Sequence, residues 1–127
     1  MKTFLFSLVL FALVFALVVV NAVFLETSIA DLRVALNHIP IPSEQSNDLT
    51  LQLSHLTEVE KMWYQNIFLF SLTISHQDLM EVEQHLSAAI GGAKAGSRDN
   101  YITSLFQLDY ALSHLSTMSR MSLQNIF

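Results

Sequence analysis

The feature that most constrains this chain is a run of 23 residues near its start that contains no charged side chain. Residues 3–25 are mostly Leu, Val, Phe and Ala, and they lie between Lys2 and Glu26. A helix of that length spans about 34 Å, and the hydrocarbon core of a bilayer is about 30 Å thick. We therefore expect residues 1–25 to be a transmembrane anchor whose partner is the lipid bilayer.

A cleaved signal peptide is the alternative interpretation of the same segment. Lys2 supplies a basic start, and Val20-Asn21-Ala22 is an acceptable cleavage motif. The apolar stretch from Phe4 to Val20 is 17 residues long, whereas a signal peptide typically has about 7–15. We favour a retained, single-pass anchor in the cell membrane, and a cleaved, secreted protein stays open. Lys2 favours a cytoplasmic N-terminus, which would place residues 26–127 outside the cytoplasm.

The apolar pattern of residues 26–127 predicts an all-α fold in which the transmembrane helix continues into a small antiparallel bundle. Leu25, Ile29, Leu32, Leu36 and Ile39 recur at alternating spacings of four and three, which indicates one helical face. Pro40 and Pro42 should end this first helix near residues 37–38. We expect further helices over residues 48–70, 76 to about 90, and 98 to about 118, with Gly91-Gly92 and then Gly96 closing the third.

Local signals refine these helices. Ser46 or Asn47 is the expected N-cap of the second helix, and Ser75 that of the third. Glu60 interrupts the apolar stripe of the second helix. An unpaired buried carboxylate is costly, so we expect Glu60 at the edge of the core, with Val59 pointing inward.

Two apolar groups of side chains could serve either the core or a partner. The first group belongs to the second helix and should form mainly core, with an exposed patch for a protein partner as the alternative: Trp63, Tyr64, Phe68 and Phe70. The second is the C-terminal segment 121–127, with Leu123, Ile126 and Phe127. We expect it to pack back on the bundle around Trp63, Phe70 and the start of the third helix near His76.

Several classes of activity find no support in the composition. The chain has no Cys, and its net charge of −5 lacks the basic surface that nucleic-acid binding needs. No Gly-x-Ser-x-Gly elbow or phosphate-binding glycine loop is present. The sequence predicts no catalytic residue, no cofactor and no cofactor-binding residue.

The five histidines do not combine into a metal motif. His55 with Glu58 and Glu81 with His85 each share a helix face, but neither pair forms the Glu-x-x-His pattern of a di-metal bundle. The sequence therefore predicts no metal site, and His76 is expected to hydrogen-bond the preceding turn or the Trp63 region. We expect a non-enzymatic module whose partner is another membrane or extracytoplasmic protein; a metal-dependent enzyme is the less favoured alternative.

The sequence resembles the domain of unknown function 4363 family over most of its length. The resemblance is carried by the region from Trp63 to Glu83 and by the ending Met-Ser-Leu-Gln-Asn-Ile-Phe, where the family often has Leu-Ser-Leu-Glu-Asn-Ile-Phe. Met121 and Gln124 depart from that ending. The family consists of short bacterial proteins with an N-terminal membrane segment and a helical remainder. The resemblance thus implies an architecture and a membrane location, and it implies no activity.

Overall fold

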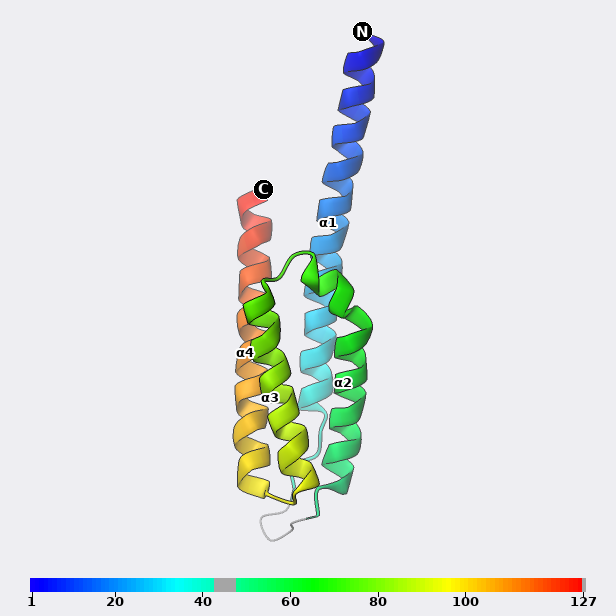
Figure 1. Ribbon diagram of the computed structural model, residues 1–127. Coiled ribbons are helices and arrows are strands. Elements are labelled where there is room, and N and C mark those ends of the chain that lie inside the picture. The colour runs from blue at the N-terminus through cyan, green and yellow to red at the C-terminus, as the bar shows by residue number, and fades with distance from the viewer. Residues whose placement is uncertain (43–47, 127) are drawn as a thin grey trace.

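The part of the chain that the structure describes forms four helices that pack as an antiparallel bundle, and the first helix extends far beyond the other three (Figure 1). The computed structural model describes residues 1–42 and 48–126, excluding the side chains of residues 119, 120 and 122–126. Helices α1 and α3 each pack against both α2 and α4, which closes the bundle. The described residues contain no strand. The all-α fold expected from the sequence is confirmed.

Helix α1 (Lys2–Asn37) is one uninterrupted helix of 36 residues. No glycine or proline interrupts it, and it ends three residues before Pro40, as predicted. Its buried positions begin only at Ala22. The core positions predicted from the alternating spacing, from Leu25 to Ile39, are all buried. The same helix therefore supplies the exposed apolar segment and one wall of the bundle.

Helix α2 (Thr50–Ser71) starts two residues later than predicted. Asp48 Oδ1 accepts hydrogen bonds from the backbone N of Thr50 at 3.1 Å and from its hydroxyl at 2.6 Å. The predicted caps, Ser46 and Asn47, lie outside the described residues. Val59 is buried and Glu60 is only partly exposed at the edge of the core, which confirms the prediction for this pair.

Helix α3 (His76–Lys94) begins as predicted, because the Ser75 hydroxyl accepts a hydrogen bond from the backbone N of Asp78 at 3.2 Å. The predicted end near Ile90 is wrong, because the helix continues to Lys94. Of the three glycines expected to close the helix, Gly96 is the one in the left-handed conformation, with φ 68°.

Gly92 has a packing role instead of a capping role. A Cβ atom added to Gly92 would lie 2.8 Å from the backbone N of Tyr101, on α4. The two backbones can approach this closely only because Gly92 has no side chain. Gly91, one position earlier, would meet nothing within 4 Å.

Helix α4 (Arg98–Ile126) is longer than the predicted helix, which stopped near Met118. Its backbone continues through Ile126, past the turn between α2 and α3, toward the end where α1 leaves the bundle (Figure 1). Residues 121–126 are therefore a continuation of the helix and do not form a separate tail that folds back. The expected docking of Leu123, Ile126 and Phe127 rests on side chains that the structure does not describe.

The core runs the length of the bundle and contains Trp63, Tyr101 and Phe70 as its largest fully buried side chains. The rings of Trp63 and Phe70 pack at a centroid distance of 5.1 Å. Tyr64 and Phe68, the other two aromatic residues of the same stretch, are exposed. The aromatic group thus divides between core and surface.

Candidate functional site

The most distinctive surface is the part of α1 that precedes the bundle, residues 2–20, which we call the stalk. All its side chains up to Val18 are exposed, and nearly all are apolar. The most apolar 18-residue window of the whole helix α1 has a mean hydropathy of 3.0, and only 11% of that window is buried. The core helix of a soluble protein would be mostly buried, whereas a membrane span and a signal sequence both fit these values. Exposed apolar surface of this extent marks contact with a membrane or another protein.

The stalk joins the bundle at a defined polar contact. Asn21 Nδ2 donates a hydrogen bond to the hydroxyl of Thr73, in the turn between α2 and α3, at 2.6 Å. The neighbouring Ala22 and Leu25 are buried. The α2–α3 turn is therefore held at the level where α1 enters the bundle, and we call this end the stalk end.

A partly open cavity of about 330 Å³ lies at the stalk end. It is mainly apolar, with Thr73, Ser75 and Asp78 as its polar members; the lining residues are Leu25, Thr73, Ile74, Ser75, Asp78, Leu115 and Met118. The cavity contains no pair of groups arranged as nucleophile and base, so it offers apolar contact and no evident chemistry.

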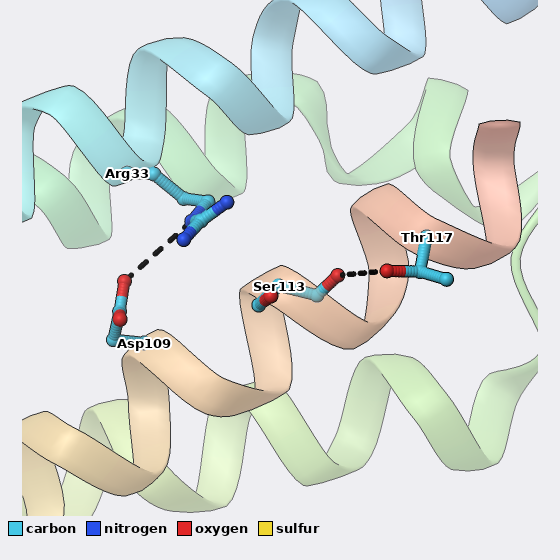
Figure 2. Close-up of polar contacts among 4 residues, drawn as sticks. All are labelled: Arg33, Asp109, Ser113 and Thr117. Atoms are coloured by element: carbon cyan, nitrogen blue, oxygen red, sulfur yellow. Dashed lines mark hydrogen bonds and ion pairs between the residues drawn. The ribbon is translucent and has the colours of Figure 1, made fainter.

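An ion pair links α1 and α4 further along the bundle. Arg33 Nε lies 3.5 Å from Asp109 Oδ1, and both side chains are partly exposed (Figure 2). On the same side of α4 the Thr117 hydroxyl donates to the carbonyl oxygen of Ser113 at 3.1 Å (Figure 2). Partly exposed pairs of this kind contribute little stability, so we assign Arg33–Asp109 a role in alignment.

The histidines do not gather. Among the residues that the structure describes, no three His, Asp or Glu side chains lie close enough to hold a metal ion. Glu81 and His85 do approach each other, with Oε1 and Nε2 4.0 Å apart on the surface of α3. His76 is exposed at the first position of α3.

The partner of Trp63 is a contact that sequence reasoning missed. The indole Nε1 donates a hydrogen bond to Glu83 Oε1, on α3, at 3.3 Å. A buried indole N–H normally needs an acceptor, so the sequence required a partner, but it did not identify Glu83; it associated only His76 with the preceding turn or the Trp63 region. Desolvation, with smaller contributions from the charges of Glu83 and Glu60, raises the pKa of Tyr64 beside this pair. The arrangement joins α2 to α3, and its role is structural.

Comparison of the chain with protein-family models, with curated proteins and with solved structures finds no match. The site therefore stands on its own geometry: an apolar stalk, a polar contact at its base and a closed helical bundle.

Proposed function

We propose that this chain is a single-pass membrane protein that presents a non-enzymatic helical bundle for interaction with another membrane or extracytoplasmic protein. The observation that carries the proposal is the stalk, an exposed helix that is continuous with the bundle. Lys2, at the start of the stalk, favours a cytoplasmic N-terminus and hence a bundle outside the cytoplasm. The resemblance to a family of membrane-anchored helical proteins supports the same assignment.

The base of the stalk supports retention of the segment over cleavage. The motif that a signal peptidase would use is Val20-Asn21-Ala22, and in the folded chain Asn21 bonds Thr73 while Ala22 is buried against the bundle. A segment destined for removal would contribute nothing to the mature fold. Here its last two residues form part of the packing.

Membrane fractionation of cells that express the full chain tests the anchor. The protein should stay in the membrane pellet after washing with high salt and with alkaline carbonate. Its measured mass should correspond to a chain that begins at Met1 or Lys2. A variant with Leu10→Arg and Leu13→Arg should partly leave the pellet, because each charge at the centre of a span costs about 2.5–3.5 kcal/mol. A mature form that begins at Val23 and is released into the medium would show that the segment is a signal peptide.

A further inference from the structure

We infer that the stalk end of the bundle is seated in the headgroup layer of the same bilayer that the stalk crosses, with the α2–α3 turn and the end of α4 in contact with lipid. The inference rests on the proposed membrane anchor. It adds a second lipid-binding surface, on the bundle, and fixes the distance between the bundle and the membrane.

The first argument is the length of the stalk. The uncharged run has 23 residues, but its last five, residues 21–25, belong to the bundle, where Asn21 bonds Thr73 and Leu25 is buried. Residues 3–20 remain, and 18 helical residues span about 27 Å. The hydrocarbon core is about 30 Å thick. No length is left for a spacer, so the stalk end must meet the membrane surface.

The second argument is the position of exposed apolar side chains. Phe68, in the last turn of α2, is 71% exposed, and Leu72, in the α2–α3 turn next to Thr73, is 63% exposed. Val20 and Val23, on α1 at the same end, are also exposed. Apolar side chains on two elements are thus exposed at the end that faces the bilayer, and such groups bind the interface between headgroups and acyl chains.

The third argument is the length of α4. Leu25 of α1 and Met118 of α4 line the same cavity, so they lie at one level. Helix α4 continues to Ile126, eight residues further, which is about 12 Å. Met121 on this extension is exposed. The end of α4 therefore extends past the α2–α3 turn, toward the bilayer that the stalk crosses (Figure 1).

Polar groups limit the depth of this contact. Thr73 and Ser75 lie in the α2–α3 turn, and His76 and Gln77 are exposed at the start of α3. Asp78 follows within the same turn of helix. These groups suit the hydrated headgroup layer and would be costly in hydrocarbon. The turn therefore rests among headgroups, where the exposed Phe68 and Leu72 and the end of α4 meet lipid.

The absence of cysteine in the chain makes site-specific labelling a direct test. Full-length Phe68→Cys and Leu72→Cys variants, each labelled with bimane, are reconstituted in phosphatidylcholine vesicles that contain lipid brominated near the top of the acyl chain. Phe106→Cys is the matched control, because Phe106 is 73% exposed and lies on α4, 12 residues before Met118. Leu13→Cys reports the stalk itself. Circular dichroism verifies that the helix content of each labelled variant is unchanged.

Labels at positions 68 and 72 should be quenched by brominated lipid several-fold more than the label at 106, and aqueous iodide should give the reverse order. If the label at 13 is quenched by lipid while those at 68, 72 and 106 all report water, the inference is wrong and the anchor stands. If the label at 13 also reports water, the anchor itself is wrong, and the seating of the bundle fails with it.

Discussion

Adding one methyl group at either of two adjacent glycines should change stability in opposite directions. Gly91 and Gly92 both lie inside α3, so Gly→Ala at either position removes the same backbone flexibility and gains about 1 kcal/mol of helix propensity. At Gly91 the new methyl group meets nothing within 4 Å. Gly91→Ala should therefore stabilise the chain by up to about 1 kcal/mol.

At Gly92 the new methyl group would lie 2.8 Å from the backbone N and 3.1 Å from Cα of Tyr101, and 3.2 Å from the carbonyl carbon of Asn100. All three are backbone atoms, so relief requires α4 to move away from α3, whose mutual contact is the most extensive in the bundle. Overpacking of this kind costs about 1–3 kcal/mol, and rigid backbone neighbours place Gly92→Ala at the upper end. After the propensity gain, the net loss is about 2 kcal/mol.

Thermal unfolding of the full chain in detergent micelles, followed by circular dichroism, measures both effects. About 1 kcal/mol shifts the Tm of a domain of this size by roughly 4–8 °C. Gly92→Ala should lower the Tm by roughly 8–16 °C, and Gly91→Ala should raise it. The difference between the two variants isolates the packing cost, because the propensity gain is common to both. Equal shifts in the same direction would refute the close approach of α3 and α4 at Gly92.

Three further predictions concern Trp63, Tyr101 and the C-terminal segment. Glu83→Ala leaves the buried indole N–H of Trp63 without its acceptor and should cost about 1–3 kcal/mol, whereas Glu83→Gln, which keeps an acceptor oxygen, should cost less in the same denaturation assay. Burial raises the pKa of Tyr101 to about 12 from an ordinary value of 10. The free energy of unfolding should therefore be independent of this group below pH 10 and should decrease as the pH rises toward 12. Tyr101→Phe should make this decrease smaller. Deletion of residues 123–127 should lower the Tm in detergent by several degrees if Leu123, Ile126 and Phe127 dock on the bundle; an unchanged Tm would show that they contribute nothing to its stability.

The sequence predicted most of the fold because its strongest signals are local. The two prolines stop α1, the Ser75 hydroxyl caps α3, and apolar residues at helical spacing identify the inward faces. Even the interruption of the apolar stripe of α2 by Glu60 was predictable, because the neighbouring Val59 could take the inward position. These features depend on neighbours within one or two turns of helix.

The errors arise where one local signal has two meanings. A glycine pair near the end of a helix fits a C-cap, but it equally fits a position where another backbone approaches, and only the contact of Gly92 with Tyr101 distinguishes them. The predicted stop of α4 near Met118 had no glycine or proline to support it. The acceptor for Trp63 is 20 residues away on another helix, where several polar side chains would have served equally well by sequence.

The stalk is a further case in which the sequence and the fold lead to different lengths for the same segment. The sequence contains 23 uncharged residues, which suffice for a complete span. The fold assigns the last five of them to the bundle through the Asn21–Thr73 hydrogen bond and the buried Leu25. Because α1 has no break between the two parts, any tilt or vertical displacement of the stalk is transmitted to the bundle as a rigid body. In a chain anchored by this stalk, the orientation of the bundle at the membrane would thus be set by helix continuity, without a linker.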